Sequence, residues 1–261
     1  MAEKLRLVTF NIAHGRGLSL YQKFSPPKKI RKNLAAIGEL LRNVNADIVA
    51  LQEVDEDSHW NWNINLLHEI RESCGLEHAE IGVNNRRTGP RPLAYGNAIL
   101  SRFPLHHWEN QAFGQATLGE KGFLYAEVDY RGHLLPLLNL HLDFKSRKKR
   151  LEQVERIVDY IVDREHPGSN GDPLSPIICG DFNSRSEPKK DAVNHLFAHI
   201  LAHRQYHRYP ESDFTFPAHF PRKAIDFVFL PEPYQKLRCE VLPGYFSDHR
   251  PVLIEFEVPE F

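Results

Sequence analysis

The stretch Ala46-Asp47-Ile48-Val49-Ala50-Leu51-Gln52-Glu53 is a short apolar run that ends in two polar residues. Its length and its polar end are typical of a buried strand. Before it, residues 25–44 carry apolar side chains at spacings of three and four, which predicts an amphipathic helix entered through Ser25-Pro26-Pro27. Residues 5–11 precede that helix and are rich in residues that suit a strand. The order strand, helix, strand favours an α/β architecture.

The rest of the chain is predicted to hold many strands and few helices. Helical spacing from Leu151 predicts a helix that closes at 166–168, and a further helix is expected at 191–203. This mixture favours sheets that pack on each other with helices outside. With 261 residues and no repeat, we expect a single domain spanning 1–261, in which 167–176 is a surface loop. The further expected strands are 98–100, 123–128, 135–142, 176–179, 225–230, 237–242 and 251–256.

The composition is that of a packed globular protein. Hydrophobic residues make up 41%, and 33 Lys+Arg against 34 Asp+Glu give a formal net charge of −1. The balance excludes a long-range field that attracts polyanions, so any affinity for phosphate must be local. No apolar stretch approaches the roughly 20 residues that span a bilayer, and the first residues lack the pattern of a secretory signal. Three distant cysteines predict neither a disulfide framework nor a thiolate zinc site, so we expect a monomer in a reducing cytoplasm.

Acids, amides and histidines stand at the ends of most expected strands. Taken singly, each is better explained as a cap, an ion pair or a hydrogen-bonded core residue. Because strand ends of an open α/β sheet gather in one crevice, however, we expect these side chains to converge. Oxygen ligands with few sulfurs favour a hard cation such as Mg²⁺ or Mn²⁺, which points to phosphate-ester chemistry. The residues are Asn11, Glu53, His141, Asp181, Asn183, Asp226, Asp248 and His249.

The segments that hold these residues resemble the endonuclease/exonuclease/phosphatase superfamily, which includes pancreatic deoxyribonuclease, abasic-site endonucleases, neutral sphingomyelinases and inositol-polyphosphate 5-phosphatases. The resemblance implies an α/β fold of four layers (αββα), with two mainly antiparallel sheets face to face and helices outside. The matching segments follow the family order and are Thr9-Phe10-Asn11-Ile12, Leu51-Gln52-Glu53-Val54, Asn97-Ala98-Ile99-Leu100-Ser101-Arg102-Phe103-Pro104, Asn139-Leu140-His141-Leu142, Gly180-Asp181-Phe182-Asn183-Ser184, Ile225-Asp226-Phe227-Val228 and Ser247-Asp248-His249-Arg250-Pro251.

The resemblance also implies a divalent-metal-dependent phosphoesterase that uses Mg²⁺ or Mn²⁺. Water would attack phosphorus in line while the metal neutralises developing charge. By position in the motifs, Glu53 would be the principal metal carboxylate, with Asn11 and Asp248 completing or supporting the site. One metal ion and two remain equally open alternatives.

The other five polar residues would act on the phosphate and the water. His249 would lie close to the phosphate, oriented by Asp226, as a carboxylate fixes a histidine tautomer in other hydrolases. Asp181 and Asn183 would position the water and the phosphoryl oxygens. His141 would donate to a non-bridging oxygen as charge builds there. Either His249 or Asp181 would remove the proton from water.

Substrate choice rests on weaker features. The basic run 145–150 follows the strand that holds His141. Two interpretations are open: the run lines a path for a polyanion, or it forms a solvated charged face. Lys145 and Arg147 are its candidate substrate contacts. Arg102, in the third matching segment, is another candidate. We therefore expect a phosphate-ester substrate, with DNA or RNA favoured. The alternatives are a phosphodiesterase for lipid headgroups, a phosphatase for small molecules, and a non-catalytic binding module.

Two further patterns each allow a functional and a structural interpretation. For Trp60 and Trp62, near Glu53, the functional interpretations are stacking on a base or entry into a lipid surface, and the structural interpretation is packing inside the protein. His195, His199, His203 and His207 are four apart and predict a loose helical stripe that holds zinc or forms a polar face.

Overall fold

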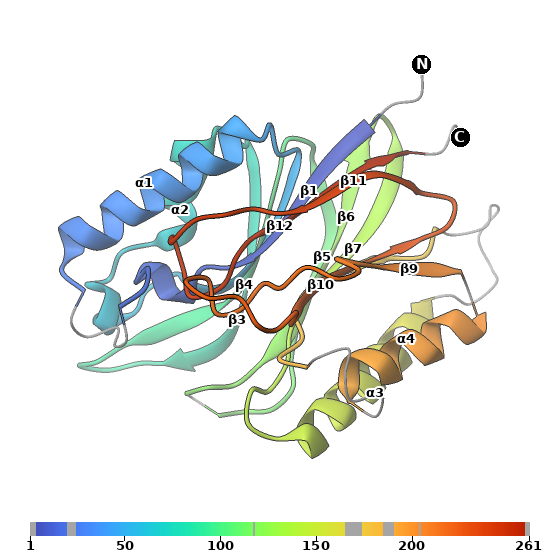
Figure 1. Cartoon of the computed structure of the whole chain (residues 1–261). Helices are drawn as coiled ribbons and strands as arrows, with labels where there is room; N and C mark the ends of the chain where they lie inside the picture. The colour runs from blue at the N-terminus through green and yellow to red at the C-terminus, as the bar shows by residue number, and fades with distance from the viewer. Residues whose placement is uncertain are drawn as a thin grey trace.

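Two six-stranded sheets face each other at the centre of the molecule (Figure 1). The computed structural model describes residues 4–19, 25–116, 118–164, 174–184, 191–203 and 205–258, with backbone alone at 201–203. The first sheet has the order β11-β12-β1-β2-β4-β3 and contains β1 (Lys4–Asn11), β2 (Ile48–Asp55), β3 (His78–Arg87), β4 (Leu93–Ser101), β11 (Gln235–Val241) and β12 (Val252–Glu257). The second has the order β5-β6-β7-β8-β10-β9 and contains β5 (Leu105–Ala112), β6 (Gly122–Tyr130), β7 (His133–His141), β8 (Ile177–Asp181), β9 (Tyr206–Tyr209) and β10 (Asp226–Pro231).

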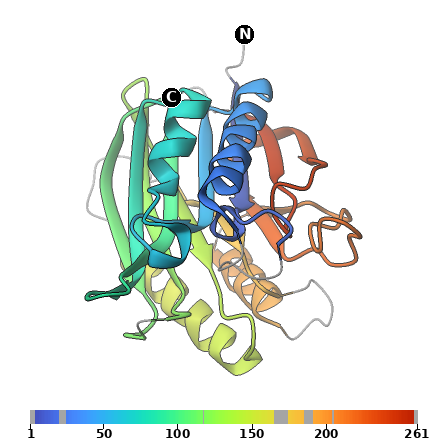
Figure 2. The same cartoon turned by 90° about the vertical axis from the view of Figure 1, so that its left-hand side faces the viewer.

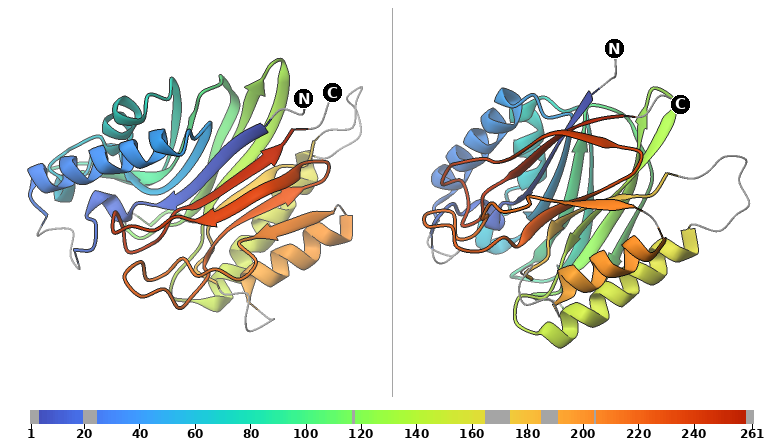
Figure 3. Two further views of the ribbon diagram at one scale, coloured as in Figure 1. Left: turned by 45° about the horizontal axis from the view of Figure 1, so that its top comes forward. Right: turned by 45° about the vertical axis from the view of Figure 1, so that its right-hand side comes forward.

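Helices cover the outer face of each sheet (Figure 3). α1 (Pro27–Asn43) and α2 (Leu66–Cys74) pack on the first sheet, and α3 (Arg147–Arg164) and α4 (Ala192–His203) pack on the second. One apolar core lies between the sheets and one lies under each helix pair. The four-layer sandwich expected from the sequence is therefore confirmed. Each sheet is mixed, since β1 with β2 and β7 with β8 are parallel while the other described pairs are antiparallel.

The side chains of β1 show why the strand lies in a central layer. Leu5 and Leu7 belong to the core between the sheets, whereas Val8 and Phe10 belong to the core under α1 and α2. Alternate side chains of a strand point to opposite faces, so this strand is buried on both. On α1 the apolar stripe predicted from spacing is almost completely buried; it consists of Ile30, Leu34, Ile37 and Leu41.

Buried amide side chains join the two sheets directly behind their polar edge. Gln52 on β2 donates through Nε2 to Asn139 Oδ1 on β7 at 2.7 Å and to Thr9 Oγ1 at 3.1 Å. Asn139 donates through Nδ2 to the carbonyl oxygens of Leu51 and Ala98, both at 2.9 Å. The Nε2 of Gln52 and both polar atoms of Asn139 are thus hydrogen-bonded, whereas the buried Gln52 Oε1 has no hydrogen-bond partner within the part of the protein that the structure describes.

The sequence did not predict α2 or the strands β3, β5 and β9. β5 and much of β3 are half-buried or exposed, so they lack the apolar pattern on which the prediction depended. α3 begins at Arg147, four residues before the expected Leu151, because its first turn is charged. The expected closure of that helix at 166–168 lies outside the described residues. Among the helices that the structure describes, none is long and apolar enough to cross a membrane.

Candidate active site

Most of the polar residues predicted from strand ends lie at one edge of the sandwich. Asn11 ends β1, His141 ends β7 and Asp181 ends β8. Asp226 is the first residue of β10, which runs antiparallel to β8, so Asp226 pairs directly with Asp181. Parallel strands that end together, with an antiparallel neighbour that starts there, thus place side chains from distant parts of the sequence at one edge.

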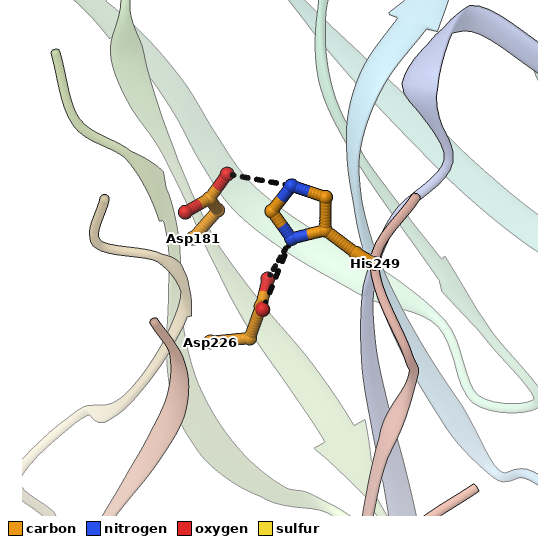
Figure 4. Close-up of side chains that lie close together, drawn as sticks. All are labelled: Asp181, Asp226 and His249. Atoms are coloured by element: carbon orange, nitrogen blue, oxygen red, sulfur yellow. Dashed lines mark hydrogen bonds and ion pairs between the residues drawn. The ribbon is translucent and has the colours of Figure 1, made fainter. Parts of the chain in front are cut away.

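His249 links the two sheets at this edge (Figure 4). It lies in the loop before β12, and its Nδ1 is 3.0 Å from both carboxylate oxygens of Asp226. Its Nε2 lies 3.7 Å from Asp181 Oδ2. Asn11 adds a second link between the sheets, because its Nδ2 donates to Asp181 Oδ2 at 2.9 Å. All four side chains are buried.

Burial and neighbouring charges shift the pKa values of His249 and Asp181. Burial opposes a charged His249, but Asp226 and Asp181 outweigh it and raise the pKa of the imidazole to about 10. Burial also disfavours an ionised Asp181; His249 opposes that effect and Asp226 reinforces it, and the pKa of Asp181 rises to about 7. His249 is therefore an imidazolium at neutral pH, and Asp181 can exchange a proton there.

Glu53 occupies the other half of the edge on a β-bulge. Gln52 pairs with Asn97 and Val54 with Gly96, so Glu53 is an extra residue, and it has a φ of 57°. A bulge redirects one side chain and disrupts the ladder locally, and a positive φ costs a non-glycine residue free energy. The strained backbone therefore lies at the position where the Glu53 carboxylate is turned out of the regular side-chain alternation of β2.

Cationic and imidazole groups surround the Glu53 carboxylate. Lys121 Nζ lies 3.3 Å from Oε1, His14 Nε2 lies 3.5 Å from Oε2, and His141 Nε2 lies 4.0 Å from Oε1. Burial favours the neutral acid, but Lys121, His14 and His141 outweigh it and hold the pKa of Glu53 well below its usual range. Glu53 is thus a carboxylate at every working pH.

His14 is held by a second buried acid, Asp55. Its Nδ1 lies 2.7 Å from Asp55 Oδ2, and Asp55 also accepts hydrogen bonds from Trp60 Nε1 at 2.8 Å and Asn61 Nδ2 at 2.6 Å. Burial lowers the pKa of His14, but Asp55 and Glu53 raise it above its usual value overall. The rings of Trp60 and Tyr95 both make edge-on contacts with the His14 ring. Trp60 is therefore part of the wall of the site.

His141 is neutral and lies between both halves. Burial and then Lys121 lower its pKa well below the usual value. Lys121 Nζ is 3.3 Å from Nδ1, so Nδ1 accepts and the ring proton resides on Nε2. Nε2 lies 3.3 Å from Asp181 Oδ2 and 3.2 Å from Asn183 Nδ2. The neutral ring can therefore donate from Nε2 into the space between Glu53 and Asp181.

Asp248 lies at the outer side of the site. Its Oδ2 accepts a hydrogen bond from Arg16 Nη2 at 2.8 Å, and Ser247 Oγ donates to its Oδ1. Asn11 Oδ1, another expected metal ligand, accepts from the backbone N–H of Ala13 at 3.0 Å. Both groups keep a free lone pair, but each already has a protein partner.

The donor set fits a hard divalent cation. Within the described part of the chain, the His, Cys, Asp and Glu atoms that gather closely enough to share an ion are those of Asp181, Asp226 and His249, which lie within 4.8 Å of one another. Burial, and then the neighbouring Asp226, raise the pKa of Asp181, so a cation bound beside these two carboxylates would favour their ionised forms. Oxygen-rich, sulfur-free donors with an excess of negative charge are what Mg²⁺ and Mn²⁺ select.

Comparison with known proteins agrees with this geometry. A family model described as the Endonuclease/Exonuclease/phosphatase family matches residues 8–249. The chain belongs to this family. Family members are hydrolytic phosphoesterases that typically depend on a divalent metal, so the chain is a phosphoesterase of the endonuclease/exonuclease/phosphatase family.

Several relatives share most of the chain. "Uncharacterized protein YbhP" of Escherichia coli strain K12 is 24% identical over 238 residues, which cover 86% of this chain and 88% of that protein. A Beutenbergia cavernae endonuclease/exonuclease/phosphatase structure has a TM-score of 0.72 at 18% identity, covering 98% of this chain and 72% of the other. A mannosyl-6-phosphatase of Bacteroides thetaiotaomicron has 0.68 at 16%, covering 97% and 100%. D. rerio TDP2 with a single-strand DNA product has 0.67 at 16%, covering 98% and 100%. At these identities the structures show a shared fold alone.

The predicted substrate contacts are placed less favourably. Arg102 follows β4, which runs antiparallel to β2, so it lies at the opposite edge from Glu53 and pairs with Asp47 at 2.8 Å. The expectation that Arg102 contacts the substrate is therefore corrected, because its guanidinium pairs with Asp47 away from the other site residues. Lys145 and Arg147 are exposed and follow the end of β7, on the side of the site. Lys145 Nζ lies 5.1 Å from the ring centroid of Phe144.

Trp62 and the four regularly spaced histidines are the remaining residues that the sequence patterns singled out. Trp62 is 58% exposed, and its Nε1 donates to the carbonyl oxygen of Ser25. The histidine stripe does not lie on one helix: His195 and His199 are on α4, whereas His207 is on β9. The side chain of His203 lies outside the described residues. The expected single helical face is therefore wrong, because α4 ends before His207.

Sequence reasoning missed four site residues, His14, Arg16, Asp55 and Lys121. His14 and Arg16 follow the Thr9–Ile12 motif closely, and a polar pair beside glycines was a usable signal. Asp55 lies two residues beyond Glu53 on the same strand, so its approach to the site was also open to prediction. Lys121 precedes β6 and reaches Glu53 only through the packing of the two sheets, for which the sequence has no local signal.

Proposed function

We propose that this protein is a Mg²⁺- or Mn²⁺-dependent phosphodiesterase, with a strand of DNA or RNA as the favoured substrate. The observation that carries the proposal is the position of His249, whose Nδ1 lies 3.0 Å from both oxygens of Asp226 and whose Nε2 lies 3.7 Å from Asp181 Oδ2. A buried cation beside oxygen ligands for a metal suits a phosphate ester, because both positive charges would stabilise the negative charge that develops on the phosphoryl oxygens.

Glu53 would hold the metal, with Asn11 and Asp248 completing or supporting the site. Asp181 and Asp226 offer oxygen donors to a second group, which they form with His249. When bound, the ion would neutralise charge that builds on the phosphoryl oxygens. One ion or two can be accommodated by this donor set.

The protein's own groups would perform the proton transfers and orientation. Asp181, with a pKa of about 7, would accept the proton of the attacking water, since a base works best when its pKa is near the working pH. His249 would donate a hydrogen bond to a phosphoryl oxygen, held in register by Asp226. Neutral His141 would donate from Nε2 to a non-bridging oxygen. Asn183, whose Nδ2 donates to the carbonyl oxygen of Leu142 at 3.0 Å, would help to position the phosphoryl oxygens.

Hydrolysis of bis(p-nitrophenyl) phosphate tests the reaction class. Activity should require Mg²⁺ or Mn²⁺, stop with chelator, and fall by a factor of about 100 to 10,000 in Glu53→Gln and His249→Gln. Glu255→Gln, which changes a surface ion pair with Arg6, is the matched control and should retain full activity. Full activity in both site variants would refute the assignment.

A panel of plasmid DNA, single-stranded RNA, sphingomyelin, inositol phosphates and mannose 6-phosphate tests the substrate. Cleaved nucleic acid is expected. A phosphatase for small phosphorylated molecules is the second candidate, favoured by the similarity in fold to the mannosyl-6-phosphatase. Intact nucleic acid beside a hydrolysed lipid or sugar phosphate would overturn the nuclease preference.

The chain is further proposed to act as a monomer and a single domain spanning 1–261, with light scattering as the test. Three cysteines without a disulfide support a reducing compartment such as the cytoplasm.

A further inference from the structure

A cavity of about 670 Å³ opens beside the active site, between the loop after β1, the first half of α1 and the loop before β12. Figure 2 shows the loop before β12 beside α1. Among the residues that the structure describes, three cationic side chains line the cavity and no acidic one does. The side chains that characterise it are Arg16, Leu18, Lys29, Lys32, Tyr245 and Phe246.

Arg16 connects this cavity to the active site. Its Nη2 donates to Asp248 Oδ2 at 2.8 Å, and its Nη1 donates to the carbonyl oxygen of Ser19 at 2.6 Å. Asp248 is the immediate neighbour of His249. Arg16 therefore belongs both to the wall of the cavity and to the side-chain contacts of the residue that precedes His249.

Hydrogen bonds hold the cavity walls in place. Asn33 Nδ2 donates to the carbonyl oxygens of Gly15 at 3.1 Å and Phe246 at 2.7 Å, which ties α1 to both loops. Lys29 Nζ donates to Ser19 Oγ at 2.7 Å. Lys29, Lys32 and Asn33 are three and four residues apart, so they share one face of α1. The charges are thus presented on a fixed surface.

Apolar side chains accompany these charges. Tyr245 is 62% exposed and Leu18 is 41% exposed. Exposed aromatic rings beside basic groups are the usual means of binding single-stranded nucleic acid, because a ring stacks on a base while cations bind the backbone. The net charge of −1 makes a local basic surface necessary for any such binding.

We propose that this cavity is a subsite for the nucleotide next to the scissile phosphodiester of a single-stranded nucleic acid. Lys32 and Lys29 bind its phosphate, and the Tyr245 ring stacks on its base. The inference rests on the proposed function and names the substrate part that the cavity recognises.

Binding of fluorescein-labelled oligothymidylate and oligouridylate in chelator tests the charges without cleavage. Lys32→Glu should weaken binding about tenfold and reduce the slope of log affinity against log salt by about one. Lys28→Glu is the matched control, since Lys28 is exposed on the same helix and does not line the cavity; it should change binding by less than about twofold. Equal weakening by both variants would overturn the proposal.

Two tyrosine variants test the ring. Tyr245→Ala should weaken oligonucleotide binding at least about fivefold, whereas Tyr245→Phe should bind like the parent because it keeps the ring. Loss of binding in both variants, or in neither, contradicts stacking. Tighter binding to phosphatidylserine vesicles than to either oligonucleotide, with the same sensitivity to Lys32→Glu, would assign the cavity to lipid and overturn the proposal.

Hydrolysis of bis(p-nitrophenyl) phosphate separates this inference from the proposed function. That substrate has no neighbouring nucleotide, so Lys32→Glu and Tyr245→Ala should hydrolyse it like the parent. Absence of hydrolysis in the parent would refute the proposed function. Parental hydrolysis with oligonucleotide binding unchanged in the variants would refute the subsite alone.

Discussion

Glu53, which is half-buried, and Asp181, which is buried, are two carboxylates at the same edge of the sandwich, yet their surroundings drive their acidities apart. Glu53 faces Lys121 and His14, and its pKa lies well below the usual range. Asp181 shares one imidazolium with Asp226, and its pKa rises to about 7. When two acids in a site differ in this way, the environment assigns one to charge and the other to proton transfer. Glu53 is thus held as a carboxylate that can serve as a ligand, whereas Asp181 is suited to exchanging a proton.

The largest loss of activity is expected from a substitution beside Asp181. Asp226→Asn should reduce kcat/KM on bis(p-nitrophenyl) phosphate about 100- to 10,000-fold, because His249 loses the acid that orients and charges it. The alkaline limb of the pH–rate profile should also move to lower pH. A uniform loss across the pH range would indicate that Asp226 serves structure only.

The second prediction concerns the charge of His249 and is measured by thermal unfolding in chelator. Its pKa rises from 6.5 to about 10 in the folded protein, so the stability that it contributes is complete below pH 6.5 and is lost as pH rises through about 10. His249→Gln should therefore lower Tm most at about pH 6, by at least about 2–4 °C, and least above about pH 10. A difference independent of pH would contradict the paired imidazolium.

The third prediction concerns the charge of Lys121 beside Glu53. Lys121→Met removes the cation nearest to a carboxylate that is only 22% exposed. We expect a loss of about 1–3 kcal/mol in the free energy of unfolding in chelator. Mg²⁺ should reduce that loss, since it replaces the missing charge. Lys121→Arg is the control that keeps the charge, and an equal loss in both variants would show that packing alone is involved.

The smallest effect is expected far from both halves. Glu255→Gln disrupts ion pairs with Arg6 and Lys4 at partly exposed positions and should cost at most about 1 kcal/mol at neutral pH. Because these partners lower the pKa of Glu255, the cost should disappear as pH falls through that lowered pKa. Denaturant unfolding at neutral and acid pH measures both, and a persistent cost in acid would assign it to packing.

Sequence reasoning succeeded where a pattern reports burial directly. The buried β2 and α1 were predicted because their apolar residues repeat at strand and helix spacing, whereas the exposed β5 has no such repeat. Polar residues at strand ends were expected to meet, and the structure brings Asn11, Glu53 and their partners to one edge.

The remaining parts of the site depend on how strands are arranged rather than on local pattern. Arg102 was expected near the substrate, but the antiparallel return of β4 carries it to the opposite edge. Lys121 reaches Glu53 only because β6 and β2 lie in facing sheets. The roles of the predicted site residues, in contrast to their positions, remain predictions for the experiments above.

The amide bridge between Gln52 and Asn139 has a mechanical consequence. It fastens the two sheets to each other immediately beneath the acids, so sliding of one sheet past the other would break several buried hydrogen bonds at once. The width available to a phosphate is therefore set when the chain folds. Substrates should be sorted by how well they fit a gap of constant size, with little contribution from closure around them.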